Sequence, residues 1–198
     1  KQGIVLLRPE DVTEPQLHFI HHYFRENVRP FIEPAILDKK SHDGFLRNRA
    51  LYLIVVLRSL QKKHDADATG CVSIPAETLP RFVTLPAEDG KHVVMFLDDI
   101  IRVNLDTVFE EWEVDGAWAV KLNRDADLHI EDEFSGDLVK KIKQALSKRE
   151  TGVPARFLYD PSLPKATLRE LRRHYGLKSE DLFPGGRYHN FHDLFSFP

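Results

Sequence analysis

The chain has 198 residues, of which 42% are hydrophobic and 30% are charged, and its formal net charge is -3. This length and composition predict one compact domain with a substantial core and exclude a disordered or fibrous protein. The near balance of charge gives no global basic field, so we expect no binding to nucleic acid. The longest apolar run, residues 51–57, is too short to span a bilayer. A single cysteine excludes a disulfide framework and a cysteine-rich zinc site.

The first helix is expected to begin after Thr13. Thr13 is a suitable N-cap, Pro15 fits the first turn, and Gln16 stands at the capping-box position. An apolar stripe at helical spacing follows and ends near Pro30. Its members are Leu17, Ile20, Phe24 and Val28.

Two histidines of this helix, His18 and His22, have the four-residue spacing that a metal site could use. They lack the glutamate of an HExxH motif, and the sequence offers no third ligand. We therefore favour packed or solvated histidines over a metal site.

The next third of the chain predicts strands. Residues 51–57 form a continuous run of β-branched, aromatic and leucine side chains, which is typical of a central strand buried on both faces. Returning strands are expected at residues 71–74 and 93–96. Residues 81–84 are flanked by proline-containing segments, which favours an edge strand.

A helix is expected over residues 97–109, with Asp98 and Asp99 in its first turn. Carboxylates at a helix N-terminus complement the helix dipole, and we favour this role. Metal binding by the two aspartates is the alternative.

The pattern of residues 118–159 predicts a strand at 118–122, a helix whose apolar residues run at helical spacing from 134 to 146, and a second strand at 155–159. A connecting helix of this length is far longer than a hairpin turn, so we expect two parallel strands joined by a right-handed crossover. The predicted fold is a single α/β domain, with an α+β variant as the alternative, in which helices cover a mixed sheet.

Basic residues around this unit are candidates for anion contact. Arg124 lies at the charged end of the strand at 118–122, where open α/β sheets often bind ligands, and Lys148 and Arg149 lie towards the C-terminal end of the expected helix. A solvated loop and a favourable interaction with the helix dipole explain the same charges without a ligand.

The C-terminal part predicts a helix with Leu168, Leu171 and Tyr175 facing inward and Gly176 at its end. Ser162 is its expected N-cap, and Pro164 fits its first turn.

The segment Gly185-Gly186-Arg187 follows this helix. Its glycines allow backbone amides to converge, so an anion could dock there beside Arg187. The alternative is a glycine turn that leads into an aromatic-rich closing helix.

Common catalytic motifs are absent from the sequence. It contains no GxxxxGK[ST] loop, no GxGxxG after a strand, no GxSxG elbow and no HExxH helix. The chain therefore has no self-contained catalytic constellation of a familiar kind.

Several segments closely resemble the bacterial polyphosphate kinase family, in its larger, phosphohistidine-forming type. They occur in the order of the family and cover nearly the whole chain. The segments are residues 21–24 (HHYF), 45–46 (FL), 74–86 (IPAETLPRFVTLP), 97–102 (LDDIIR), 123–127 (NRDAD) and 184–193 (PGGRYHNFHD).

The resemblance implies that residues 1–198 are the middle, or head, domain of such an enzyme and that residues 1–12 are a remnant of the linker from an N-terminal helical domain. Family members are longer, and two C-terminal phospholipase-D-like domains carry the phosphorylated histidine and bind ATP with Mg²⁺. This chain would then contain no catalytic residue, no nucleotide-binding residue, no metal ligand and no cofactor of its own. None of its ten histidines is given the catalytic role.

For the family, the resemblance implies reversible transfer of the terminal phosphate of ATP to polyphosphate, by a bacterial, cytoplasmic phosphotransferase. Peripheral membrane association is left open. The middle domain is expected to support dimerisation and to shape a polyphosphate tunnel, and to be inactive alone. Its partners would be the rest of the kinase chain, a second copy and polyphosphate. A polyanion-binding module that uses Arg124, Lys148, Arg149 and Arg187, and a protein-interaction domain without catalytic role, are the two alternatives.

Overall fold

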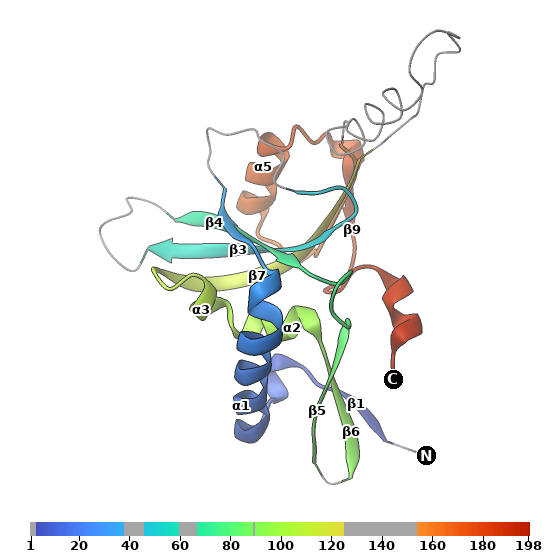
Figure 1. The fold of residues 1–198 in the computed structure, drawn as a ribbon. Helices are drawn as coiled ribbons and strands as arrows, with labels where there is room; N and C mark the ends of the chain where they lie inside the picture. The colour runs from blue at the N-terminus through green and yellow to red at the C-terminus, as the bar shows by residue number, and fades with distance from the viewer. Residues whose placement is uncertain (1–2, 38–45, 60–66, 89, 125–153) are drawn as a thin grey trace, which may run out of the picture.

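The computed structural model describes residues 3–37, 46–59, 67–88, 90–124 and 154–198 (Figure 1). The short η elements are 3-10 helices, except η2, which is a π-helical turn. In chain order the elements are β1 (Ile4–Leu6), η1 (Pro9–Asp11), α1 (Glu14–Tyr23), η2 (Phe24–Val28), η3 (Arg29–Phe31), β2 (Pro34–Ile36), β3 (Leu51–Ser59), β4 (Ala68–Ile74), β5 (Phe82–Glu88), β6 (Lys91–Phe96), α2 (Leu97–Val103), α3 (Leu105–Val108), β7 (Trp112–Arg124), β8 (Pro154–Tyr159), α5 (Lys165–His174), η4 (Ser179–Asp181), β9 (Leu182–Pro184) and η5 (Phe191–Ser196).

Two sheets organise the described part of the chain. The larger sheet has the strand order β2-β4-β3-β7-β8-β9, and the smaller sheet has the order β1-β6-β5. Strand β1 runs parallel to β6, and β8 runs parallel to β9, whereas the other neighbouring strands are antiparallel. The prediction of a single mixed α/β domain is confirmed.

The predicted central strand is also confirmed. Strand β3 lies between β4 and β7, and Leu53, Ile54 and Val55 have no exposed surface. Covering helices on both faces explain why the run is continuously apolar rather than alternating. Strand β5 lies at an edge, as expected from its flanking prolines, although it extends further along the chain than residue 84.

The predicted parallel crossover between residues 118 and 159 is wrong. Strands β7 and β8 are antiparallel, with Val120 opposite Tyr159 and Leu122 opposite Phe157. A long connection between two neighbouring strands is typical of a parallel pair. An antiparallel pair, however, imposes no upper limit on the connection between its strands. The helix expected at 134–146 lies outside the described residues.

The two faces of the larger sheet carry separate parts of the core. Helices α1 and α2 cover one face, and α5 covers the other (Figure 1). On the first face Ile20, Ile100 and Leu53 belong to one buried cluster, which continues into the smaller sheet through Met95. On the second face, Leu171 of α5 packs in a cluster with other buried side chains. Each such side chain contributes about 1.5–3 kcal/mol when it is fully buried.

Local signals explain where the helices begin and end. The capping box at the start of α1 is confirmed, because the Thr13 amide donates to Oε1 of Gln16 at 3.1 Å. Gly176 follows α5 with φ of 64°, which favours glycine. The N-cap prediction for α5 is wrong. The N-cap is Pro164, and the Ser162 hydroxyl donates to Asp160 instead.

The single helix expected over residues 97–109 is interrupted at Asn104. The Asn104 side chain donates to the carbonyl of Ile100 at 2.7 Å, and the Thr107 hydroxyl donates to the carbonyl of Asn104 at 2.8 Å. Such short side chains compete with the backbone for hydrogen bonds, which separates α2 from α3.

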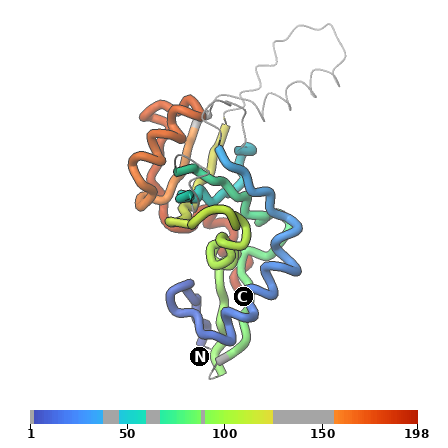
Figure 2. The backbone as a smooth tube through the Cα atoms, turned by 90° about the vertical axis from the view of Figure 1, so that its left-hand side faces the viewer, coloured from blue at the N-terminus to red at the C-terminus, as the bar shows by residue number. Residues whose placement is uncertain are grey.

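Both termini lie on the side of the molecule that holds the smaller sheet, away from α5 (Figure 2). The last described segment, from β9 to η5, therefore passes from the larger sheet toward the smaller one. Among the helices that the structure describes, none is both long and apolar enough to cross a membrane.

Candidate functional site

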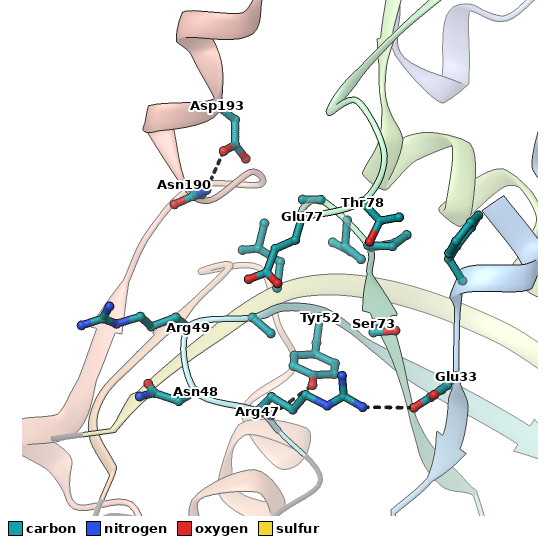
Figure 3. Close-up of a pocket in the computed structure, with 16 residues that line it drawn as sticks. Glu33, Arg47, Asn48, Arg49, Tyr52, Ser73, Glu77, Thr78, Asn190 and Asp193 are labelled. Atoms are coloured by element: carbon teal, nitrogen blue, oxygen red, sulfur yellow. Dashed lines mark hydrogen bonds and ion pairs between the residues drawn. The ribbon is translucent and has the colours of Figure 1, made fainter. Parts of the chain in front are cut away.

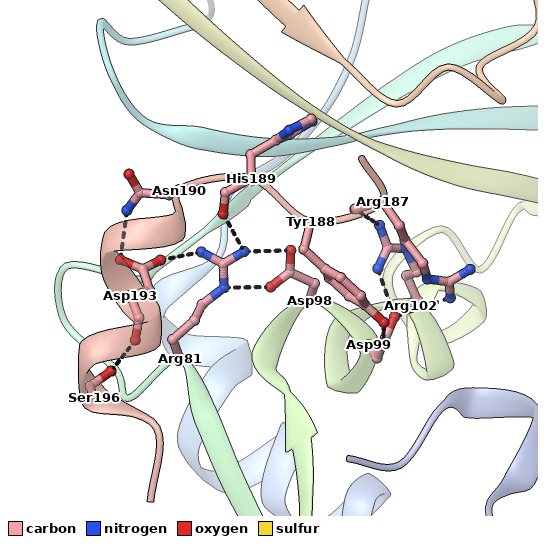
Figure 4. A network of polar contacts seen from close by, with 10 residues as sticks. All are labelled: Arg81, Asp98, Asp99, Arg102, Arg187, Tyr188, His189, Asn190, Asp193 and Ser196. Atoms are coloured by element: carbon pink, nitrogen blue, oxygen red, sulfur yellow. Dashed lines mark hydrogen bonds and ion pairs between the residues drawn. The ribbon is translucent and has the colours of Figure 1, made fainter. Parts of the chain in front are cut away.

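A buried arginine lies where the two sheets meet the C-terminal segment. Arg81 precedes β5, and its guanidinium donates to both carboxylate oxygens of Asp98, at 2.7 and 2.8 Å (Figure 4). The side chains of Arg81 and Asp98 are 2% and 0% exposed. Arg81 also donates to Asp193 of η5 and to the carbonyl of His189. One cation therefore ties β5 and α2 to the end of the chain.

The neighbouring Asp99 has its own set of partners. Arg102, one turn along α2, donates to its Oδ1 at 2.7 Å, and Arg187 donates to the same oxygen at 3.2 Å. The Tyr188 hydroxyl donates to Oδ2 at 2.6 Å (Figure 4). Asp99 is fully buried, so these bonds replace the water that its charge would otherwise need.

Aromatic stacking extends this contact. The Tyr188 ring stacks on Phe96 with 3.9 Å between ring centroids and 13° between planes. Burial raises the pKa of Tyr188 to about 12, and its bond to Asp99 acts in the same direction. Tyr188 therefore stays protonated at neutral pH, when it can donate to the carboxylate.

His189 joins the C-terminal segment to the larger sheet. Its Nε2 donates to the carbonyl of Ala119 on β7 at 2.8 Å, and the residue is 4% exposed. Burial lowers the pKa of His189, and the positive charge of Arg81 acts in the same direction. The imidazole is therefore neutral at physiological pH.

We call the ion pairs of Arg81, Arg102 and Arg187 with Asp98, Asp99 and Asp193 the charge network. It contains three cations and three carboxylates. It fastens the C-terminal segment across both sheets with no net charge left over. Its role is structural, because each of its carboxylates is paired with an arginine.

The sequence contains a signal for this network. Asp98 and Asp99 interrupt a run of large apolar residues, and Arg81 directly precedes Phe82. Charged residues are almost never fully buried unless they are paired. The two aspartates stand in the first turn of α2, as the helix-dipole interpretation predicts, but α2 has no side-chain cap hydrogen bond at its N-terminus.

The predicted anion-contact residues do not all meet. Arg187 lies near Ala117, since Arg102 donates both to the carbonyl of Arg187 and to that of Ala117. Arg124 ends β7, seven residues or roughly 23 Å further along the strand. Lys148 and Arg149 lie outside the described residues. Arg187 is 44% exposed, yet part of its charge is committed to Asp99.

The two glycines before Arg187 have a packing explanation. The Gly185 amide donates to the carbonyl of Tyr159, so it does not point at an anion. A Cβ at Gly185 would approach Cε1 of His189 to 2.9 Å, which real Cβ atoms essentially never show, and Cδ1 of Leu158 to 3.0 Å, which is tighter than nine in ten real Cβ contacts. Gly185 is therefore required by the buried histidine ring. At Gly186 a Cβ would meet only a backbone oxygen at 3.8 Å.

A pocket of about 790 Å³ adjoins the charge network (Figure 3). It is bordered by Arg47 and Glu33, which form an exposed ion pair at 3.6 Å, and by Glu77 and Asp193. The Arg49 guanidinium points out of the pocket, away from Arg47 (Figure 3). Carboxylates outnumber arginines in the lining, so the interior does not favour an anion. The lining residues are Phe31, Glu33, Arg47, Asn48, Arg49, Ala50, Leu51, Tyr52, Ser73, Ile74, Pro75, Ala76, Glu77, Thr78, Asn190 and Asp193.

The described residues contain no group of three or more His, Cys, Asp or Glu side chains that could hold a metal ion. At the predicted pair on α1, His18 is exposed, and Nδ1 of His22 lies 3.3 Å from a guanidinium nitrogen of Arg25. The single cysteine, Cys71, is fully buried on β4, and burial raises the pKa of its thiol. A buried neutral thiol is a poor nucleophile.

Comparisons with known proteins agree with one another. Residues 15–197 match the family model described as the polyphosphate kinase middle domain. The polyphosphate kinases of Vibrio cholerae serotype O1 and Escherichia coli strain K12 are 35% and 30% identical to the whole chain. The chain spans 29% of the length of each of these relatives.

A solved structure is similar over almost the same range. The crystal structure of polyphosphate kinase from Porphyromonas gingivalis superimposes with a TM-score of 0.78 at 29% sequence identity. It covers 99% of this chain and 27% of the solved one. Sequence and fold lead to the same conclusion: the chain belongs to the polyphosphate kinase family, in which it corresponds to the middle domain.

Proposed function

We propose that this chain is the non-catalytic middle part of an enzyme that reversibly transfers the terminal phosphate of ATP to polyphosphate through a phosphohistidine. The observation that carries the proposal is the family match over residues 15–197, in a chain that spans 29% of its curated relatives. Residues 1–12 act in this proposal as a linker, whose strand β1 is anchored to β6.

The described residues support a division of labour. Phosphoryl transfer through a histidine needs an activated imidazole beside positioned cations. Of the described histidines, His189 is committed to a backbone carbonyl, and Nδ1 of His21 forms a hydrogen bond with Asn104 at 2.8 Å. In this proposal ATP, Mg²⁺ and the phosphorylated histidine belong to other parts of the parent enzyme.

The proposed contribution of the middle domain is shape. It supports dimerisation and forms part of the wall of a tunnel for polyphosphate. A rigid wall needs fixed elements, and the charge network joins α2 and β5 to η5 through buried ion pairs. Exposed apolar side chains on η5, Phe191 and Phe195, are available for contact with another part of the enzyme or a second copy.

The test compares the 198-residue chain with its full-length parent. Both are incubated with γ-labelled ATP and Mg²⁺, then assayed for polyphosphate and for acid-labile protein phosphate. We expect both signals from the parent and neither from the chain alone, because the nucleophile is elsewhere. An acid-labile phosphohistidine on the isolated chain would contradict the division of labour. A parent without ATP-dependent polyphosphate synthesis would contradict the family activity.

A further inference from the structure

Lys121 is a half-buried cation in the middle of the larger sheet. Its Nζ donates to Oδ1 of Asn190 at 3.1 Å. On β7 it is flanked by Leu51 of β3 and Leu158 of β8, which are its cross-strand partners. Asp193, the nearby carboxylate, is already bound by Arg81 and by the Asn190 amide.

Two arginines lie beside Lys121. Arg156 precedes Leu158 by two residues, so it shares a face of the sheet with Lys121, at a diagonal spacing of roughly 7–8 Å. Arg49 stands just before β3, and its amide donates to the carbonyl of Leu122 at 2.9 Å. Its guanidinium points out of the adjoining pocket (Figure 3). We call Arg49, Lys121 and Arg156 the cation triad.

The cation triad is not neutralised within the described part of the chain. None of its members takes part in the ion pairs found there. Arg156 instead lies over the ring of Phe183, 4.9 Å from its centroid. Burial lowers the pKa of Lys121, the negative charge of Asp193 opposes this shift, and the positive charges of Arg49, Arg81 and Arg156 lower the pKa further. Clustered positive charge without an ion-pair partner attracts an anion.

The backbone conformation of Arg49 is a second observation that favours a binding role. Its φ is 66°, in the left-handed region that glycine or asparagine normally occupies. Two hydrogen bonds to β7 hold this turn, one from the Arg49 amide to the carbonyl of Leu122 and one from the Arg124 amide to Oδ1 of Asn48. Backbone strain of this kind is common at functional sites, so the strain points to a use for the exposed side chain of Arg49.

The spacing of the cation triad fits an extended anion. Arg49, Lys121 and Arg156 belong to β3 and its preceding turn, β7 and β8, which are three successive strands of one sheet. Outer strands of such a trio are roughly 10 Å apart. From this geometry we propose that the cation triad is a subsite that binds a linear polyphosphate chain, with successive phosphates lying across the three strands. The proposal rests on the proposed function and names a new part of its substrate path.

The test uses the full-length enzyme, since the triad would act on polyphosphate that the catalytic parts extend or shorten. The triple variant Arg49→Gln, Lys121→Gln, Arg156→Gln removes the three charges. The matched control is Lys165→Gln, Arg169→Gln, Arg173→Gln, which removes three exposed cations of α5 on the opposite face of the sheet. The KM for long-chain polyphosphate is measured in the direction of ATP formation from ADP over a series of salt concentrations.

We expect the triple variant to raise this KM about tenfold or more at low salt, and to reduce the slope of log KM against log salt by about 2–3, as three lost phosphate contacts predict. The control should keep the wild-type KM and slope. An unchanged KM and slope in a triple variant that melts like wild type would overturn the subsite.

Two further measurements keep the outcomes separate. If the triple variant fails to fold, the single variant Arg156→Gln changes only an exposed side chain and should raise the KM in the same direction. An unchanged KM in that variant would then overturn the proposal. A wild-type parent that forms no ATP from polyphosphate would instead refute the proposed function.

Discussion

Arg81 is the most buried of the three arginines in the charge network, and Asp98 beside it has no exposed surface. Two parallel hydrogen bonds join them, an arrangement that suits the planar guanidinium and that lysine could not reproduce. A buried ion pair of this kind adds little net stability compared with an apolar pair of the same size. Its removal from one side, however, leaves an unpaired charge in the core.

The first prediction at this scale is that Arg81→Met lowers the free energy of unfolding by about 3–5 kcal/mol, because Asp98 is left unpaired. Urea unfolding followed by circular dichroism measures the loss. The matched control is Arg58→Met, which breaks an ion pair with Asp115 whose side chains are 53% and 40% exposed. That change should cost less than about 1 kcal/mol. Equal losses in the two variants would show that the buried pair is not the source of the effect.

At the scale of elements, the C-terminal segment from Gly185 to η5 is held by contacts at both ends. Tyr188 stacks on β6, Asp193 meets Arg81, and His189 reaches across to β7. These contacts come from residues far apart in the sequence, so the segment depends on the correct assembly of both sheets.

The second prediction concerns pH and follows from His189. Burial lowers the pKa of the folded imidazole below its usual value near 6.5, so between these values the unfolded chain binds more protons. The contribution of His189 to the free energy of unfolding is complete above about pH 6.5 and is lost as the pH falls toward the pKa of the folded imidazole. We expect stability to decline on acidification by up to about 1.4 kcal/mol per pH unit from this residue.

Urea unfolding at pH 7.5 and 5.5 tests this contribution. His189→Gln should lessen the difference between the two pH values, since a glutamine amide can still donate to Ala119 but does not titrate. His92→Gln, at an exposed position of β6, is the matched control and should retain the wild-type difference. A His189→Gln variant with the full wild-type pH dependence would contradict the assignment.

At the scale of the whole molecule, the C-terminal segment combines buried ion pairs with exposed apolar side chains. The inner side of the C-terminal segment is committed to the charge network, whereas Phe191 and Phe195 of η5 are 77% and 90% exposed. Exposed aromatic side chains next to a fixed scaffold are typical of contact surfaces. This arrangement supports the proposed role of the middle domain in assembly.

We therefore predict that the 198-residue chain forms a concentration-dependent dimer in sedimentation velocity experiments. Phe191→Ser with Phe195→Ser should shift it toward monomer by removing apolar contact area. The pair Ile4→Ser with Leu6→Ser, on the exposed edge strand β1, is the comparison for a different surface. A chain that stays monomeric at every concentration would contradict this prediction.

The sequence by itself determined the family, the single mixed domain and most of the elements. The apolar run at 51–57, the capping box at Thr13 and the glycine at 176 act within a few residues, so each could be recognised without a fold. Recognition of the family rested in the same way on contiguous segments of residues.

Only the tertiary structure decided which strands are neighbours and which charges meet. The direction of β8 relative to β7 depends on the path of a long connection, which periodicity does not encode. Arg81 meets Asp193 across 112 positions of sequence, and Lys121 lies beside Arg49 and Arg156 only because β3, β7 and β8 are adjacent. Long-range pairing of charge is a property of the packed sheets, because no local pattern selects one distant partner over another.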